Sequence, residues 1–288
     1  MGAYDSLRRR CLSVSVRHVR VGHMTEQGMR LASGDARGIQ SLVESQFGPQ
    51  AAAYVLSSVH AAGADLDALA AAVAGRGLET ALDLGCGGGH VSFTLAPHVG
   101  QVSAYDLSAA MLAAVKVEAA RRGLANITTQ EGCAEALPFA AESFDLVVSR
   151  YSAHHWSDLP AGLGAARRVV KARGRVVMMD VIAPAHPVQD SFLQTVELLR
   201  DPSHVRDYAL AQWRALALAA GFAVERVETR RLRLEFQSWI TRLRTDPLHV
   251  AAIRSLQALV PDTVRDHFEI EPDGSFTVDT ATLVLTPA

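Results

Sequence analysis

The stretch Ala81-Leu82-Asp83-Leu84-Gly85-Cys86-Gly87-Gly88-Gly89 decides the fold that we expect for this 288-residue chain. A largely apolar run that suits a buried strand leads directly into a turn in which four of five residues are glycine. Glycine costs about 0.5–1 kcal/mol relative to alanine within regular structure, so this density indicates a reason beyond turning. Gly85 and Gly87 permit positive φ and close approach of the backbone to a ligand. The alternative is a tight strand-to-helix connection without a ligand.

Short apolar runs alternate with longer amphipathic stretches after Gly77, which is typical of βαβ units around a parallel sheet. The expected strands are Thr80–Leu84, Gln101–Asp106, Ile127–Glu131, Phe144–Arg150, Gly174–Val181, Phe222–Thr229 and Gly274–Leu285. The expected helices are Gly89–Ala96, Ala109–Arg122, Leu159–Val170, Gln189–Arg200 and Leu210–Ala220, with further helix inside Ser238–Leu259. Right-handed crossovers place the carboxyl ends of parallel strands at one edge of the sheet, where ligands bind.

The pattern predicts one α/β domain, a Rossmann-like seven-stranded, mostly parallel sheet with helices on both faces. Residues 24–75 form an expected N-terminal helical cover, and residues 76–288 form the domain proper. Two substrate-side helical insertions are expected at about 184–215 and 238–268. We interpret residues 1–23, which are rich in arginine, as a disordered or misassigned extension, with a mitochondrial presequence as the alternative.

Composition narrows the class of protein. The formal net charge of −2 gives no basic footprint for nucleic acid. No apolar run approaches the roughly 20 residues that span a bilayer. The three cysteines form no Cys-x-x-Cys pair, which argues against a disulfide framework and a structural zinc site. We expect a cytoplasmic protein without a nucleic-acid partner, and a homodimer is left open.

The identity of the ligand depends on residues that flank the glycine turn. A dinucleotide fingerprint needs glycine or alanine at position 90, which is His90 in this chain. Asp106 ends the next expected strand, roughly twenty residues past the glycines, where a carboxylate accepts hydrogen bonds from ribose hydroxyls. The alternative for Asp106 is a solvated turn or a helix cap. Met111 follows at a distance suited to packing on adenine, or is an ordinary core methionine.

Two stretches carry a resemblance to a known family. The spacing D-x-G-x-G-x-G, from Asp83 to Gly89, resembles motif I of class I methyltransferases. The stretch Gly132–Phe139, followed by Ser143–Val148, resembles the G-D-A-E-x-L-P-F … F-D-x-V text of the type 11 methyltransferases, the ubiquinone/menaquinone-biosynthesis C-methyltransferase-like group. The resemblance covers about residues 47–181.

This resemblance implies S-adenosyl-L-methionine as the cofactor and a small molecule as the methyl acceptor. The cofactor residues that it implies are Asp83, Gly85, Gly87, Asp106 and Met111, with Cys133, Ala134 and Glu135 in the loop around adenine. Cys133 replaces the aspartate that usually binds the adenine amino group, so backbone amides near Ala134 are expected to contact the ring edge. Tyr54 shares a helix face with Phe47, as in the lid helix of the family.

Candidate catalytic residues follow the fourth expected strand. His154 or His155 would act as a base toward a weakly acidic acceptor, since histidine titrates near neutral pH. The alternative is that the two histidines only shape the pocket. Arg150 would bind the methionine carboxylate or an acceptor anion, or is a surface arginine. Three weaker candidates, in the expected substrate region, are His204, Asp207 and Tyr208.

No metal site is expected, because Asp180 is the one well-placed carboxylate near the strand ends. The function that the sequence favours is S-adenosylmethionine-dependent methylation of a carbon or an oxygen of a small molecule. One alternative is a protein that binds S-adenosylmethionine without catalysis. The other is a nicotinamide-dependent oxidoreductase, against which His90 and the stretch Cys133–Phe139 count.

Overall fold

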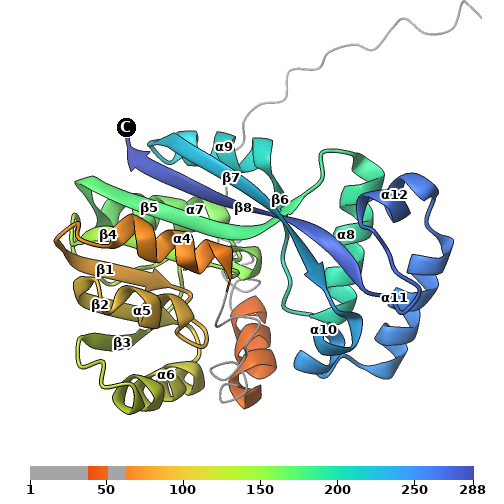
Figure 1. Cartoon of the computed structure of the whole chain (residues 1–288), viewed down its shortest axis with the longest axis horizontal. Coiled ribbons are helices and arrows are strands. Elements are labelled where there is room, and N and C mark those ends of the chain that lie inside the picture. The colour runs from red at the N-terminus through yellow and green to blue at the C-terminus, as the bar shows by residue number, and fades with distance from the viewer. Residues whose placement is uncertain (1–37, 51–62) are drawn as a thin grey trace, which may run out of the picture. The chain divides into compact units, whose positions relative to one another are not determined.

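The computed structural model describes residues 38–50 and 63–288, and its centre is a twisted sheet (Figure 1). The strand order is β3-β2-β1-β4-β5-β8-β7. The strand bounds are β1 Leu78–Leu84, β2 Val99–Asp106, β3 Ile127–Glu131, β4 Phe144–Arg150, β5 Val170–Ala183, β7 Phe222–Leu234 and β8 Phe276–Pro287. Strands β1 to β5 pair in parallel, and β8 runs antiparallel to both β5 and β7. The expected seven-stranded, mostly parallel sheet is confirmed; the two-residue β6, Tyr208–Ala209, is an addition that pairs with β5.

Alternation of side chains explains why β1 forms in the middle of this sheet. Leu82 and Leu84 face one apolar layer, whereas Ala81 faces the other, and all three are fully buried. Successive residues of a strand point to opposite faces, so a central strand buries both of its faces. The apolar start of the deciding stretch therefore becomes the core of the domain.

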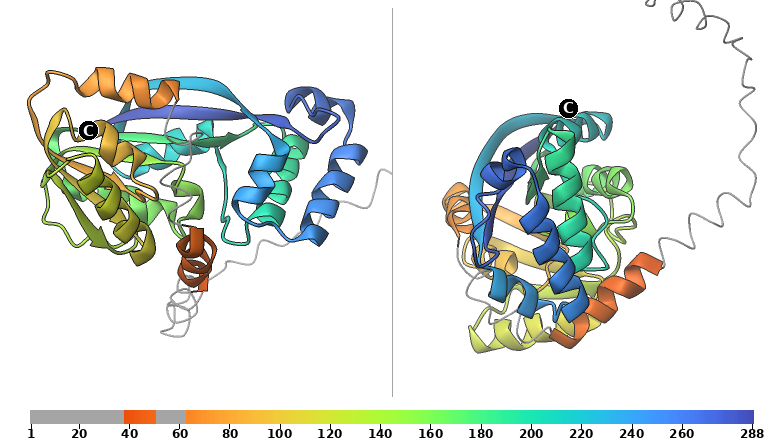
Figure 2. Two further views of the ribbon diagram at one scale, coloured as in Figure 1. Left: turned by 60° about the horizontal axis from the view of Figure 1, so that its bottom comes forward. Right: turned by 90° about the vertical axis from the view of Figure 1, so that its right-hand side faces the viewer.

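Helices cover both faces of the sheet, as expected (Figure 2). Helices α4 and α5 supply apolar side chains to one layer, and α7 and α9 supply the other. The helix bounds are α4 Ala64–Val73, α5 His90–Leu95, α6 Ala109–Arg121, α7 Leu159–Val169, α8 Pro187–Arg200, α9 Leu210–Ala219, α10 Phe236–Arg242, α11 Pro247–Leu259 and α12 Asp262–His267. Residues 38–47 are helical, and two 3-10 helices are η1 Gly48–Gln50 and η2 Ala153–His155. Ser108 caps α6 by accepting a hydrogen bond from the amide of Met111 at 3.3 Å.

A separate apolar cluster, called here the insertion cluster, lies at one end of the sheet (Figure 1). Its helices are α8, α10, α11 and α12, which cover the far ends of β5 and β8. Its fully buried side chains are Leu193, Val196, Ile253, Val264, Phe268, Phe276 and Val278. Strand β7 continues past the expected end at Thr229 to Leu234, because Leu232 and Leu234 pack on this cluster.

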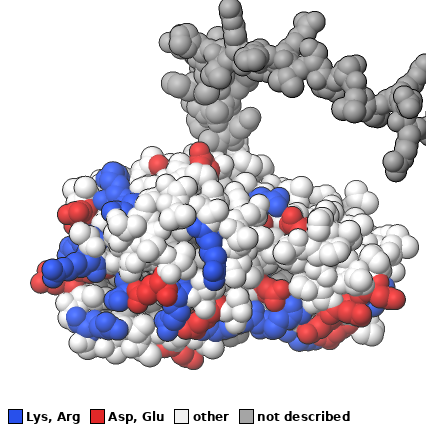
Figure 3. Space-filling model, turned by 90° about the horizontal axis from the view of Figure 1, so that it is seen from above, with Lys and Arg blue, Asp and Glu red and all other residues white. Residues whose placement is uncertain are grey.

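Charged side chains of both signs are interspersed on the face shown in Figure 3. On β7, Arg226 and Arg230 both pair with Glu228, and Arg233 pairs with Glu271. Within the described residues no helix combines the length and the apolar character needed to cross a membrane. The expectations for Tyr54 and for residues 1–23 fall outside the part of the chain that the structure describes.

Candidate functional site

The glycine turn connects β1 to α5 with positive φ at Gly85, Gly87 and Gly89. A side chain at Gly85 would overlap Ser152, because its Cβ would lie 1.9 Å from the Ser152 Oγ. A Cβ at Gly87 would meet no atom within 4 Å and would enter open space instead. Gly85 is therefore required by packing inside the protein, whereas Gly87 leaves room for a ligand.

Asp106, at the end of β2, holds this turn in place. Its Oδ2 accepts a hydrogen bond from the amide of Gly87 at 2.7 Å, and its Oδ1 accepts one from the amide of Ser108 at 2.9 Å. Burial raises the pKa of Asp106, although these backbone hydrogen bonds oppose the shift. Each carboxylate oxygen has a further lone pair for a ligand hydroxyl. Asp106 thus holds the residue that caps α6, Ser108, and also lines the cavity beside the turn.

Asp83 lies in β1, two residues before Gly85, and is 1% exposed. Its Oδ2 accepts hydrogen bonds from the Ser92 Oγ at 2.6 Å and the Ser92 amide at 2.8 Å, which fixes α5 against β1. Burial raises the pKa of Asp83 to about 7, despite the hydrogen bonds from Ser92. Asp83 therefore titrates near neutral pH in the protein without ligand.

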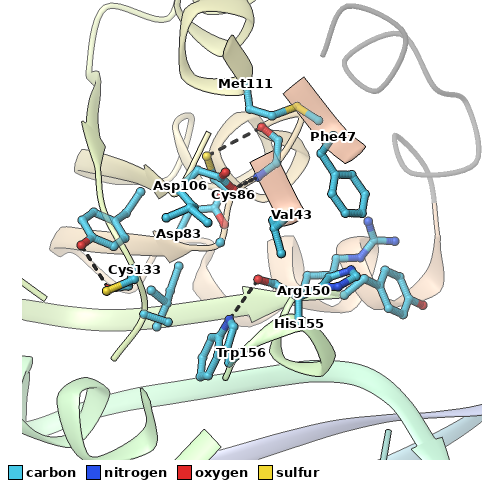
Figure 4. Close-up of a pocket in the computed structure, with 18 of the residues that line it drawn as sticks. Val43, Phe47, Asp83, Cys86, Asp106, Met111, Cys133, Arg150, His155 and Trp156 are labelled. Carbon is cyan, nitrogen blue, oxygen red and sulfur yellow. Dashed lines mark hydrogen bonds between the residues drawn. The ribbon is translucent and has the colours of Figure 1, made fainter. Parts of the chain in front are cut away.

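A first cavity opens at the carboxyl ends of β1, β2 and β4 (Figure 4). It brings together ten of the predicted site residues: Asp83, Gly85, Gly87, Asp106, Met111, Cys133, Ala134, Glu135, Arg150 and His155. Val43 and Phe47 close it from the helix over residues 38–47. The side chain of Met111 is 1% exposed and forms part of the wall next to Asp106.

The loop after β3 forms another wall of the first cavity. The hydroxyl of Tyr105 donates a hydrogen bond to the carbonyl of Cys133 at 3.2 Å. The Oε1 of Glu135 accepts hydrogen bonds from the Ser157 Oγ at 2.8 Å and the Asp158 amide at 3.3 Å. Glu135 therefore connects this loop to the segment that precedes α7.

Arg150 is buried rather than on the surface, with a side chain 7% exposed. Its Nε and one terminal nitrogen donate to the carboxylate of Asp65 on α4 at 2.5 and 3.2 Å. In this bidentate pair the carboxylate of Asp65 neutralises the positive charge of Arg150, the charge that was expected to bind a ligand carboxylate. The guanidinium also lies over the ring of Tyr151, 4.7 Å from its centroid.

The two histidines differ in position and in charge. His154 Nδ1 lies 2.6 Å from Asp180 Oδ1. Burial alone would lower the pKa of His154, but the charge of Asp180 and the hydrogen bond to it outweigh burial and raise the pKa to about 9. Burial and the nearby positive charge of His154 lower the pKa of His155 to about 4. At neutral pH His154 is therefore an imidazolium, and His155 is neutral.

His155 also has a defined tautomer. Its Nδ1 lies 3.1 Å from the carbonyl oxygen of Ser203, which can only accept, so Nδ1 carries the proton. Its Nε2 lies 3.8 Å from Asp201 Oδ2. The ring meets the edge of the Phe47 ring at a centroid distance of 5.1 Å.

A second cavity, with a volume of about 270 Å³, adjoins the first. The two share four wall residues, Phe47, Arg150, Tyr151 and His155, which we call the shared wall. Tyr151 has φ of 51°, a rare conformation for an aromatic residue, and its amide donates to the carbonyl of Met179 at 2.8 Å. Such strain is typical of functional sites.

Sequence reasoning missed most of the second cavity. Its lining includes Asp65, Glu197, Arg200, Arg230 and Trp239, which no local motif marks. Of the weaker candidates, Asp207 lines this cavity, whereas His204 lies against Gln194 and Tyr208 packs on the sheet core.

The expectation of a single well-placed carboxylate is wrong. His154, Asp180 and Asp207 each offer a ligand atom, and these atoms lie within 4.8 Å of one another. No sequence signal indicated that Asp207 lies near Asp180, because the end of β5, helix α8 and a loop separate the two residues in the chain. Residues from η2, β5 and the segment before β6 therefore form one cluster.

Comparison with known proteins agrees with this arrangement. Residues 82–178 match a family described as a methyltransferase domain. The chain is 35% identical over 199 residues to an uncharacterized methyltransferase, YcgJ, of Bacillus subtilis, covering 69% of this chain and 79% of that one. This chain belongs to the methyltransferase domain family. The methyltransferase therefore uses S-adenosylmethionine as its methyl donor.

Three further similarities extend over most of the methyltransferase. An uncharacterized protein, YafE, of Escherichia coli is 50% identical over 191 residues, which are 66% of this chain and 92% of that one. The crystal structure of YcgJ superimposes with a TM-score of 0.74 and covers 77% of this chain and 98% of that one, at 31% identity. A putative methyltransferase from Bacillus halodurans gives a TM-score of 0.75, 28% identity and coverage of 78% and 100%.

Proposed function

We propose that this methyltransferase transfers the methyl group of S-adenosylmethionine to a carbon or an oxygen of a small-molecule acceptor, with the donor in the first cavity and the acceptor in the second. The observation that carries this proposal is the shared wall of Phe47, Arg150, Tyr151 and His155. Because the two cavities share these lining residues, a sulfonium in the first would lie close to an acceptor atom in the second. Holding the two reacting atoms close together supplies most of the rate enhancement that methyl transfer needs.

The donor assignment follows from the polar groups of the first cavity. Asp106 would accept hydrogen bonds from the ribose hydroxyls, since its carboxylate faces the cavity at the end of β2. Adenine would lie between Met111 and the loop at Cys133 and Ala134. The methionine end would then extend from the turn at Gly87 toward the shared wall, since a Cβ at Gly87 would meet no atom within 4 Å and the shared wall lines the same cavity.

The acceptor assignment follows from the mixed lining of the second cavity. Met179, Leu232, Leu234 and Trp239 offer apolar surface beside charged groups, which suits a partly apolar metabolite with polar substituents. Relatives support this class. A demethylmenaquinone methyltransferase of Chlorobaculum parvum is 35% identical over 108 residues, 37% of this chain and 43% of that one. A nocamycin O-methyltransferase of Saccharothrix syringae is 36% identical over 106 residues, 36% of this chain and 38% of that one.

His155 is the proposed base where the acceptor must lose a proton. It belongs to the shared wall, and its Nδ1 is held by the carbonyl of Ser203, so Nε2 carries the lone pair. Asp201 Oδ2, 3.8 Å from Nε2, would stabilise the imidazolium that results. His154, fixed in an ion pair with Asp180, is not the base.

Calorimetric titration with S-adenosylmethionine and S-adenosylhomocysteine tests the donor site. Asp106→Asn should weaken binding at least about 10-fold, because it removes charge-assisted hydrogen bonds. Asp262→Asn, at an exposed position of α12, is the matched control and should bind as the wild type does. Equal affinity of wild type and Asp106→Asn would contradict the donor assignment.

Transfer of a labelled methyl group to a panel of phenols, quinols and polyketides tests the acceptor assignment. His155→Gln should reduce turnover with a phenolic acceptor while leaving donor affinity within a few-fold. Tight donor binding without turnover across the panel would instead favour the non-catalytic alternative.

A further inference from the structure

Three ligating side chains of the second cavity come from separate elements and meet at one point. His154 lies in η2, Asp180 in β5, and Asp207 just before β6. One ligand atom of each lies within 4.8 Å of the others. All three line the second cavity. The cluster therefore offers one imidazole nitrogen and two carboxylate oxygens beside open space.

Asp207 supplies an independent observation. It is 2% exposed, and within the described residues its Oδ2 has no hydrogen-bond partner. The closest basic group, His204 Nε2, lies 3.9 Å away and already contacts the Gln194 Oε1 at 3.1 Å. An ionised Oδ2 lacks a donor and a protonated one lacks an acceptor, and either state is unfavourable for a buried group.

The backbone at Asp207 is held by Gln194. The side-chain amide of Gln194 accepts from the Asp207 amide at 3.1 Å and donates to the Asp207 carbonyl at 2.8 Å. These two hydrogen bonds fix the main chain from which the Asp207 side chain extends. Because Asp207 lines the second cavity and one of its carboxylate oxygens has no partner among the described residues, it suits a ligand that brings positive charge.

The ion pair between His154 and Asp180 does not satisfy Asp207. The Nδ1 of His154 contacts Asp180 Oδ1 at 2.6 Å, and Asp180 also accepts from the amide of Val181 at 2.9 Å. Asp180 thus already accepts hydrogen bonds from within the protein. These contacts leave the second carboxylate of the cluster without a hydrogen-bond donor among the residues that the structure describes.

We propose that His154, Asp180 and Asp207 bind one divalent transition-metal ion, of the Mn²⁺ or Zn²⁺ type, in the second cavity. Metal–ligand distances of about 2.0–2.2 Å to nitrogen and oxygen fit a cluster of this size after small side-chain movements. A mixed imidazole and carboxylate set favours such ions over Ca²⁺, which prefers oxygen alone. Coordination requires a neutral His154 ring and ionised carboxylates, so any protons that these three groups carry are released to solvent on binding.

The three ligands leave coordination positions on the cavity side. An acceptor with an oxygen substituent would occupy one of them, and in this respect the inference rests on the proposed function. The metal site itself depends only on the cluster. Its test therefore uses direct binding of the ion rather than turnover.

The experiment titrates the full chain, after removal of metal with a chelator, with Mn²⁺ followed by electron paramagnetic resonance and with Zn²⁺ followed by calorimetry. We expect one ion per chain, and pulsed resonance of the Mn²⁺ form should show coupling to one imidazole nitrogen. Asp207→Asn should weaken affinity at least about 10-fold, because it replaces an anionic ligand with a neutral amide.

Asp201→Asn is the matched control. Asp201 is also buried, at 1% exposure, and its Oδ2 also has no hydrogen-bond partner among the described residues, but it is not part of the cluster. This variant should keep wild-type metal affinity. Folding of each variant is checked by its thermal transition, and the nitrogen coupling in the wild type keeps the test decisive even where a variant fails to fold.

Absence of saturable binding, absence of nitrogen coupling, or equal affinity in Asp207→Asn would each overturn the metal site. Titration of the same samples with S-adenosylmethionine separates the two proposals. Donor binding without metal binding would refute the metal site alone, whereas metal binding without donor binding would refute the donor assignment alone.

Discussion

Protonation of Asp83 makes the stability of the domain depend on pH. Its buried carboxyl group has a pKa of about 7, raised from 3.8 mainly by desolvation. A group whose pKa is raised on folding binds its proton more tightly in the folded state. Its stabilising contribution is therefore complete below about pH 4 and is lost as pH rises through 7.

Asp83→Asn should remove this dependence. Between pH 5 and 8 the free energy of unfolding of the wild type should fall relative to that of Asp83→Asn, by on the order of 1–4 kcal/mol. Urea unfolding at several pH values measures the difference. Asp190→Asn, a partly exposed carboxylate on α8, serves as the control for the substitution itself. A constant difference across this pH range would show that Asp83 is ionised throughout.

The turn between β1 and α5 allows a comparison of two identical substitutions. Gly85→Ala brings a Cβ into Ser152 at a φ of 71°, whereas Gly87→Ala places it in open space at a φ of 47°. Both cost the left-handed penalty of about 1–2 kcal/mol, and Gly85→Ala adds a steric overlap. Gly85→Ala should therefore lower the free energy of unfolding clearly more than Gly87→Ala.

The same two variants also distinguish an effect on packing inside the protein from an effect on ligand binding. Gly87→Ala should weaken S-adenosylmethionine binding at least about 10-fold, since the new methyl group occupies space that faces the first cavity. Thermal unfolding and calorimetry on both variants provide the measurements. Wild-type donor affinity in a folded Gly87→Ala protein would contradict the assignment of that space to the ligand.

At the scale of elements, the sequence predicted the strands that end at the first cavity. The ends of β1, β2 and β4 follow from local signals, because apolar runs stop at Gly85, Asp106 and Arg150. The extended end of β7 was missed, although Leu232 and Leu234 alternate with arginines in the period-two pattern of a half-buried strand. The sequence does not show what covers this stretch, which is the insertion cluster.

The same contrast holds for the candidate site. Residues of the first cavity come from turns that a motif marks. Those of the second cavity, such as Asp65, Glu197 and Trp239, come from helices far apart in the chain. These residues come together only through tertiary packing. For the same reason, no sequence pattern indicated that Arg150 pairs with Asp65.

At the scale of the whole molecule, the insertion cluster is a second core beside the sheet. Phe268 is fully buried there, 5.0 Å from Phe192 between ring centroids, and lines neither cavity. Phe268→Ala should lower the free energy of unfolding by about 3–5 kcal/mol through loss of apolar contact and a remaining void.

Donor binding should survive this change. In a folded Phe268→Ala protein, affinity for S-adenosylmethionine should stay within about 3-fold, because β1, β2 and β4 build the first cavity. Leu259→Ala, at a side chain 80% exposed, is the control and should change stability by less than about 0.5 kcal/mol. If donor affinity fell together with stability, packing in the insertion cluster would also be needed to hold the first cavity in shape.

The shared wall has a consequence for stereochemistry. In the proposed function the donor lies in the first cavity and the acceptor in the second, and Phe47, Arg150, Tyr151 and His155 line both cavities. On the proposed assignment the methyl carbon crosses from sulfur to acceptor in a single displacement, so that the bond being formed and the bond being broken lie on one line. A methyl group made chiral by isotopes would therefore arrive on the product with its handedness inverted.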